Sequence, residues 1–145
     1  MSSKKSRRLN ALSRGLTTIK YQNGCAFNFY YLDLEQTPVT YDNLSLLIDR
    51  LKFLSEQKLE HWSSRPIAGG RRGRNRYFKK LNDFTFSNSN LTQPANVRDD
   101  VEWSQFYIAP TFRLIGFTEK VEADPDAIDI FYVVFIDPSH DFYSP

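Results

Sequence analysis

Apolar residues recur along the chain with two different periods, which separate one helical stretch from several strands. After the Asn23-Gly24 turn signal, alternation over Cys25–Leu34 predicts a first strand. Between Thr40 and about Glu60, apolar residues return every three or four positions, which predicts an amphipathic helix capped by Thr40 or Asp42. The apolar stripe of this helix comprises Leu44, Leu47, Ile48, Leu51 and Leu54.

The second half of the chain has the pattern of strands joined by polar turns. Extended segments are predicted at Phe84–Phe86, Val101–Ile108 and Phe112–Phe117, and we expect Trp103 in the core. The nearly unbroken apolar run Ile128–Ile136 is typical of a strand covered on both faces, so we expect it at the centre of the sheet. The elements together predict a single α+β domain over residues 21–145, a curved antiparallel sheet of about four strands packed by one or two helices.

Composition narrows the class of protein. The 145 residues are 41% hydrophobic and 25% charged, as in one ordinary soluble domain. Cys25 is the only cysteine, which excludes an internal disulfide and every cysteine-based zinc site. No apolar run approaches the roughly 20 residues of a membrane helix. We therefore expect a cytoplasmic protein that requires no cofactor and does not contact a membrane.

Charge is strongly segregated along the chain. Residues 1–20, a basic N-terminal extension, hold six basic residues and no acidic one, and the Arg-rich loop 65–80 holds seven and none. The rest of the chain carries all 17 acidic residues. This pattern indicates contact with a polyanion, most simply RNA or DNA phosphate, unless both segments are merely solvated or bind an acidic protein. The basic residues of the loop are Arg65, Arg71, Arg72, Arg74, Arg76, Lys79 and Lys80.

Two features beside these basic residues have open interpretations. Leu9, Leu12 and Leu16 fit either one short amphipathic helix or a segment that becomes ordered only on binding. Tyr77 and Phe78 either stack on bases or begin the next packed element.

The C-terminal residues carry a resemblance to a known family. Phe112-Arg113-Leu114 with Gly116, the apolar run 131–136, and the closing His140 and Tyr143 resemble the C-terminal core of the RelE/ParE toxin superfamily. Its members are small domains with helices on one side of a curved antiparallel sheet, and many are ribosome-dependent mRNA endonucleases. The resemblance implies that Arg113, His140 and Tyr143 lie beside an RNA backbone. It also implies RNA on the ribosome and an antitoxin protein as partners.

The chemistry of RNA cleavage is compatible with these three residues. Attack by the RNA's own 2′-hydroxyl needs a base, a positive charge at the phosphate and an acid for the leaving oxygen, and no metal. His140 is the natural proton carrier, Arg113 could hold the phosphate, and Tyr143 could orient the nucleotide. Lys79 or Lys80 could replace Arg113 as the source of charge.

Each of the three residues also has a structural interpretation. Arg113 could pair with Asp129 across the hairpin, His140 could cap the Asp137-Pro138 turn, and Tyr143 could pack under the sheet.

Three function classes follow from the sequence. The first is a RelE-like, metal-independent endoribonuclease. The second is a non-catalytic RNA-binding or protein-interaction domain in which residues 65–80 provide the affinity. The third is an inhibitor or assembly factor whose acidic C-terminal half mimics nucleic acid and binds a basic protein.

Overall fold

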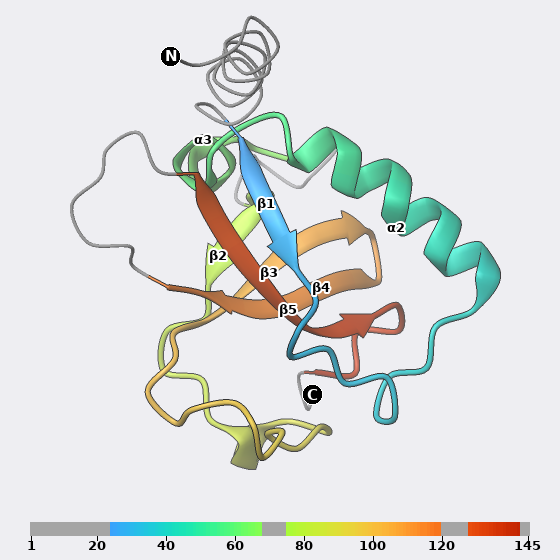
Figure 1. Cartoon of the computed structure of the whole chain (residues 1–145), viewed down its shortest axis with the longest axis vertical. Coiled ribbons are helices and arrows are strands. Elements are labelled where there is room, and N and C mark those ends of the chain that lie inside the picture. Colours follow the sequence, from blue (N-terminus) through green and yellow to red (C-terminus); the bar gives the residue numbers. More distant parts are fainter. Residues whose placement is uncertain (1–23, 68–74, 120–127, 143–145) are drawn as a thin grey trace, which may run out of the picture.

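The computed structural model describes residues 24–67, 75–119 and 128–142, which contain one five-stranded sheet (Figure 1). The strand order is β1-β5-β4-β3-β2, and every neighbouring pair is antiparallel except β1 and β5, which run parallel. The α+β class is confirmed, whereas the expected antiparallel sheet of about four strands is corrected to a mixed sheet of five. The strands are β1 (Cys25–Asn28), β2 (Phe78–Lys80), β3 (Trp103–Ala109), β4 (Phe112–Thr118) and β5 (Asp129–Asp137).

The three long strands lie close to where the hydrophobic pattern predicts them. Trp103 is buried, as expected. The interior strand β5 is covered on both faces, since Val133 points into one half of the core and Val134 into the other. The middle strand of the five is nevertheless β4, not β5, because β1 adds to the outer side of β5.

The first strand is shorter than predicted. Only Cys25–Asn28 pairs with β5. Asn28 Oδ1 then accepts the N–H of Tyr30 at 2.9 Å, and Asp33 Oδ1 accepts the N–H of Glu35 at 3.0 Å. Because these side chains bond to the backbone two residues on, they turn the chain away from the sheet before Leu34.

The predicted helix is divided into two, α2 (Tyr41–Leu54) and α3 (Leu59–Ser64). Thr40 caps α2 as predicted, since its Oγ1 accepts the N–H of Asn43 at 3.3 Å. The helix ends at Leu54 rather than near Glu60, and Trp62 of α3 donates its indole N–H to the Leu54 carbonyl at 2.7 Å. The last carbonyls of a helix have no hydrogen-bond donor within the helix, and the Trp62 indole provides one for Leu54. In the described ranges no helix is long and apolar enough to cross a membrane.

Only part of the predicted helical stripe is buried. Leu47, Leu51 and Leu54 face the sheet, whereas Leu44 and Ile48 are 45% and 58% exposed. The apolar stripe of α2 is therefore wider than the arc of the helix that the sheet covers.

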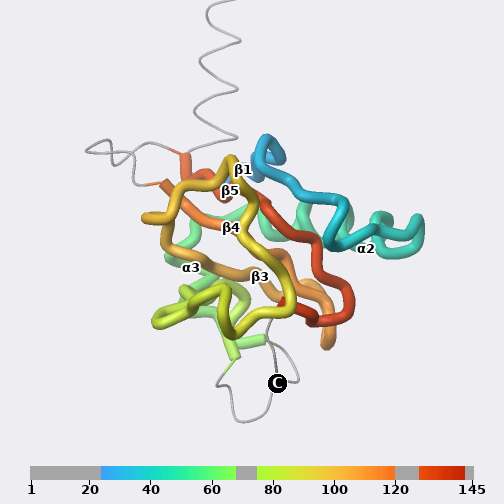
Figure 2. The backbone as a smooth tube through the Cα atoms, turned by 90° about the horizontal axis from the view of Figure 1, so that it is seen from below, coloured from blue at the N-terminus to red at the C-terminus, as the bar shows by residue number. Residues whose placement is uncertain are grey.

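Both faces of the sheet are covered, one by helices and the other by irregular segments (Figures 1 and 2). On one face α2 and α3 contribute Leu47, Leu51 and Trp62 to a core cluster. The opposite face is covered by the segment between β2 and β3 and by Phe142 near the C-terminal end.

The predicted strand at Phe84–Phe86 is absent from the structure. Asp83 has a left-handed φ of 61°, and Phe86–Asn88 forms a single 3-10 turn. Both phenylalanine rings instead pack against Phe142, at centroid distances of 4.4 and 5.9 Å. The alternating phenylalanine residues therefore pack into an aromatic cluster instead of forming a paired strand.

Candidate nucleic-acid interface

The base of the Arg-rich loop is a short antiparallel ladder beside β2. Pro66 and Arg76 form an antiparallel bridge, and the N–H of Ile67 donates to the Asn75 carbonyl at 3.0 Å. The ends of segment 68–74 are therefore held together at one edge of the sheet. Arg65 belongs to this base, since its carbonyl accepts the N–H of Tyr77 at 3.3 Å. Outside the described residues lie Arg71, Arg72 and Arg74.

A groove of about 480 Å³ opens at the foot of this ladder, and we call it the basic groove. Four cationic side chains line it, and no acidic residue is part of its lining in the described ranges. These cations come from three separate parts of the chain, the ladder, β2 and the start of β4. They are Arg76, Lys79, Lys80 and Arg113. The uncharged polar lining includes Gln105 and Tyr107 of β3.

Arg113 is held rigidly in this groove. Its guanidinium carbon lies 4.7 Å from the centre of the Tyr107 ring. Nη1 donates to three carbonyls around the β3–β4 turn, those of Ala109 (2.7 Å), Phe112 (3.1 Å) and Pro110 (3.3 Å). Nε and Nη2 have no protein partner among the residues with described positions. This edge of the guanidinium can therefore bind an anion with two hydrogen bonds.

Arg113 stays positively charged although its side chain is partly buried. Desolvation lowers the pKa of the guanidinium, while Tyr107 and the Asp137 carboxylate act in the opposite direction. An arginine remains protonated at neutral pH in proteins, so the groove keeps this positive charge.

The proposed pairing of Arg113 with Asp129 is wrong. Arg113 lies opposite Asp137 in the β4–β5 ladder. Asp129 is at the other end of the nine-residue strand β5, roughly 27 Å away at the usual rise of a strand. There its Oδ2 accepts the N–H of Leu59 at 2.9 Å and holds the start of α3.

Asp137 organises the turn that contains His140. Its carboxylate is buried, and its two oxygens accept the N–H groups of Asp141 at 2.8 Å and Phe142 at 2.9 Å. His140 has a left-handed φ of 58° within this turn. The Asp137 side chain therefore caps this turn.

The turn of His140 and the β3–β4 turn lie at the same end of the sheet. Thr111 Oγ1 donates to the Pro138 carbonyl at 3.1 Å and so joins the two turns. The structure therefore brings Arg113 and His140 to one end, but His140 does not line the basic groove. Tyr143, the third residue suggested by the family resemblance, lies outside the described residues.

The two lysines of β2 differ in their surroundings. Both are exposed on this short edge strand. Lys80 Nζ lies 3.4 Å from a carboxylate oxygen of Glu102. Lys79 pairs in register with Gln105, whose Oε1 is buried without a hydrogen-bond partner in the described parts of the chain. Since no acidic side chain forms a described ion pair with Lys79, this lysine is the simplest probe of the groove.

The aromatic residues that follow the loop belong mainly to the fold. Phe78 is buried in the core, which confirms that it begins a packed element. Tyr77 is half-buried, with its ring 5.2 Å from Trp62 and 6.2 Å from Tyr107. Neither ring is presented as a free stacking surface.

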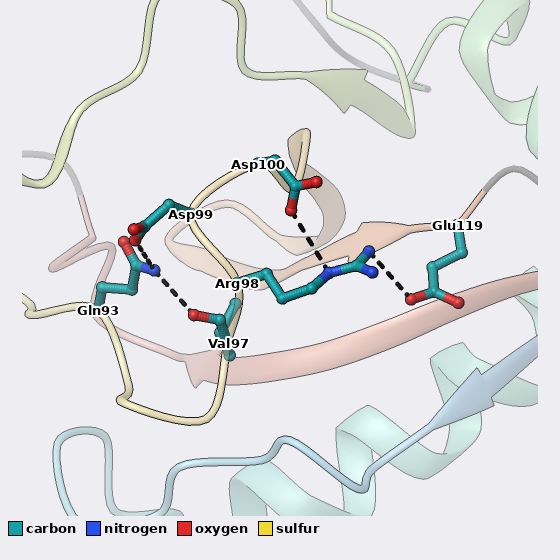
Figure 3. Close-up of polar contacts among 6 residues, drawn as sticks. All are labelled: Gln93, Val97, Arg98, Asp99, Asp100 and Glu119. Atoms are coloured by element: carbon teal, nitrogen blue, oxygen red, sulfur yellow. Dashed lines mark hydrogen bonds and ion pairs between the residues drawn. The ribbon is translucent and has the colours of Figure 1, made fainter.

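A second groove, of about 470 Å³, has a different electrostatic character. Arg98 lies between two acids there, with Nε 3.4 Å from Asp100 and Nη2 3.3 Å from Glu119 (Figure 3). On the same loop, Gln93 Nε2 donates to the Val97 carbonyl at 2.9 Å. Lys80 lines both grooves and is paired with Glu102, and Arg98 is paired with two acids. The second groove therefore offers an anion little net attraction.

Other chemistry is limited in the described ranges. No group of three or more histidine, cysteine or acidic side chains there could hold a metal ion. Cys25 is buried, and desolvation, together with the charge of Asp129, raises the pKa of its thiol to about 12. A thiol with that pKa is protonated at neutral pH and is a poor nucleophile.

Sequence reasoning did not identify Tyr107, Gln105 or Asp137 as parts of this region. The prediction for Asp137 was limited to a turn, although an acid that ends a buried strand and precedes proline is a recognisable capping signal. Tyr107 and Gln105 alternate with core residues of β3, and only the pairing of β3 with β2 and β4 brings them to the cations.

Comparison with known proteins finds no matching family model, no similar curated protein and no similar solved structure. The function of this chain is therefore argued from its own geometry and chemistry.

Proposed function

We propose that this domain binds RNA and that the basic groove, together with the Arg-rich loop, contacts the phosphate backbone. The observation that carries the proposal is the convergence of four cations on one groove whose described lining includes no acidic side chain. They are Arg76, Lys79, Lys80 and Arg113. Lysine and arginine contacts to phosphate provide most of the affinity of nucleic-acid binding that is not sequence-specific. The cytoplasm is the location in which such a protein would meet RNA.

The fixed position of Arg113 supports a phosphate as the ligand. Its Nη1 bonds and its contact with Tyr107 immobilise the guanidinium before any ligand arrives. The edge formed by Nε and Nη2, which has no partner among the described residues, matches the geometry of two phosphate oxygens. Because the side chain is already ordered, little conformational entropy is lost on binding.

The proposal is tested with two matched substitutions that each remove one exposed positive charge. A fluorescently labelled RNA is titrated with wild type, Lys79→Gln and Arg98→Gln. Lys79→Gln should weaken binding and make the log–log slope of its salt dependence shallower by about 0.7 for single-stranded RNA. Arg98→Gln should change neither, since its charge is balanced in the second groove. Equal effects of both substitutions, or no binding by the wild type, would overturn the proposal.

A second candidate function is a metal-independent endoribonuclease, and one observation favours it. Arg113 and the turn of His140 lie at the same end of the sheet, joined by the bond from Thr111 to Pro138. There His140 would transfer the proton and Arg113 would stabilise the phosphate, with Tyr143 beside the nucleotide as the family resemblance implies. RNA on the ribosome and an antitoxin would be its partners.

The two functions are distinguished by His140→Ala. In cells that express the chain, RNA is profiled for new 5′ ends. If the domain is a nuclease, wild type arrests growth and produces discrete ends, and His140→Ala abolishes both while RNA binding persists. If it only binds RNA, wild type and His140→Ala leave the RNA equally intact.

A further inference from the structure

The outer flank of α2 carries an apolar stripe that nothing in the described chain covers. Its members are Tyr41, Leu44 and Ile48, which are 85%, 45% and 58% exposed. On an ideal helix these three positions lie within about 60° of one another. They adjoin the buried row of Leu51, so the apolar arc of α2 continues beyond the sheet into solvent. Figure 1 shows α2 at the rim of the described domain.

An apolar stripe of this kind on a helix marks a docking surface more often than an isolated exposed leucine does. We propose that its occupant is the apolar part, residues 9–20, of the chain's own basic N-terminal extension. Leu9, Leu12 and Leu16 follow one another with the same three- and four-residue steps as Tyr41, Leu44 and Ile48. Two apolar rows with the same spacing can pack along their whole length.

The chain connection places this segment within reach of the stripe. The N–H of Cys25 donates to the Ser55 carbonyl at 3.2 Å, directly after the last residue of α2. Ile48 lies about 10 Å back along the helix axis from Ser55. Leu16 precedes Cys25 by nine residues, which can span roughly 30 Å when extended. From its attachment at one end of α2, the segment can therefore reach the whole stripe.

Charge favours the same pairing. Residues 24–60 contain six acidic and three basic residues, whereas residues 1–20 contain six basic and no acidic ones. Asp42 and Asp49 are exposed on α2 itself. Electrostatic attraction thus favours a basic segment on this helix, whereas the same acidic face of a second copy of the chain would be repelled.

The opposite flank of α2 provides an internal control. Leu46 is 37% exposed, and on an ideal helix it lies roughly 170° from the middle of the stripe. A charge introduced at Leu46 therefore tests general damage to α2, whereas a charge at Ile48 tests the docking surface. Neither residue is part of the sheet-facing core.

The experiment is a photocrosslink within the full chain. Tyr41 is replaced by the photoreactive residue benzoylphenylalanine, and crosslinked peptides are mapped by mass spectrometry. We expect a crosslink within one monomer from position 41 to residues 9–20. Ile48→Asp or Leu12→Asp should reduce its yield about tenfold, because each removes the burial of one apolar side chain, and Leu46→Asp should leave the yield within about twofold.

Two outcomes would overturn the proposal. A crosslink found only in covalent dimers would assign the stripe to a second copy of the chain. Equal yields in Ile48→Asp and Leu46→Asp would show that proximity alone, without docking, brings residues 9–20 to position 41. RNA binding through the basic groove is independent of both results.

Discussion

Asp137→Asn should weaken the end of the sheet where Arg113 and His140 lie. In the wild type, two oxygens of one buried carboxylate accept the N–H groups of Asp141 and Phe142. Asparagine keeps one oxygen and places an NH₂ group, which cannot accept, against the other donor. The substitution therefore removes one charge-assisted bond and leaves a neutral bond in place of the other, which should cost about 2–4 kcal/mol in the free energy of unfolding.

The assay is urea denaturation monitored by fluorescence, with Asp141→Asn as the matched control. With a urea slope of about 2 kcal/mol/M, a loss of 3 kcal/mol lowers the midpoint by about 1.5 M. Asp141 contributes only its backbone N–H to this turn and is exposed, so its amide variant should unfold within about 0.5 kcal/mol of the wild type. If Asp137→Asn also stayed within that range, the carboxylate would not hold the turn and our reasoning would be refuted.

Three further predictions concern the core, the Cys25 thiol and the ion pair between Lys80 and Glu102. A Cβ at Gly116 would lie 1.8 Å from the Tyr132 carbonyl oxygen, so Gly116→Ala should cost about 3 kcal/mol or more in urea denaturation, and a wild-type midpoint would contradict this close approach of β4 and β5. Because folding raises the pKa of Cys25 from about 9 to about 12, its contribution to stability is complete below pH 9 and is lost as the pH rises from 9 to 12. The free energy of unfolding should therefore fall there by up to about 1.4 kcal/mol per pH unit, and a Cys25→Ala variant that loses stability equally steeply would disprove the assignment. Glu102→Gln should tighten RNA binding about threefold in the fluorescence titration, because it removes the ion pair that holds Lys80. The factor is small because an exposed ion pair contributes little free energy. Weaker binding by Glu102→Gln would instead show that Glu102 assists RNA binding.

Much of the fold was predictable because the spacing of hydrophobic residues along the chain indicates which side chains are buried. The run that became β5 is buried on both faces, and such runs have few alternatives to an interior strand. Thr40 was recognisable as a cap because a threonine before an apolar-periodic stretch satisfies the open N–H groups of a helix. Local chemistry was sufficient at both places.

The errors arose where a competing interaction decided the local structure. Asn28 and Asp33 shortened the first strand through side-chain bonds to the backbone. Phe84 and Phe86 alternate like strand residues, but their burial against Phe142 depends on a contact more than fifty residues away in sequence. The parallel pairing of β1 with β5 is similarly non-local, and no pattern within either strand indicates it.

The candidate site was only partly predictable for the same reason. The charge of residues 65–80 and the position of Arg113 were evident in the sequence, but their meeting in one groove depends on the register of β2, β3 and β4. That register is set by core side chains such as Phe78 and Phe106 on the opposite face of the same strands.

The salt dependence of RNA binding tests the central claim most directly. The logarithm of the binding constant is measured against the logarithm of salt concentration for the wild type and for the full chain carrying Arg76→Gln, Lys79→Gln and Lys80→Gln. If all three side chains bind phosphate, the slope for single-stranded RNA should become shallower by about 2, because each phosphate-binding cation contributes roughly 0.7 to it. An unchanged slope and affinity in the triple variant would contradict the assignment of the basic groove as the RNA-binding surface.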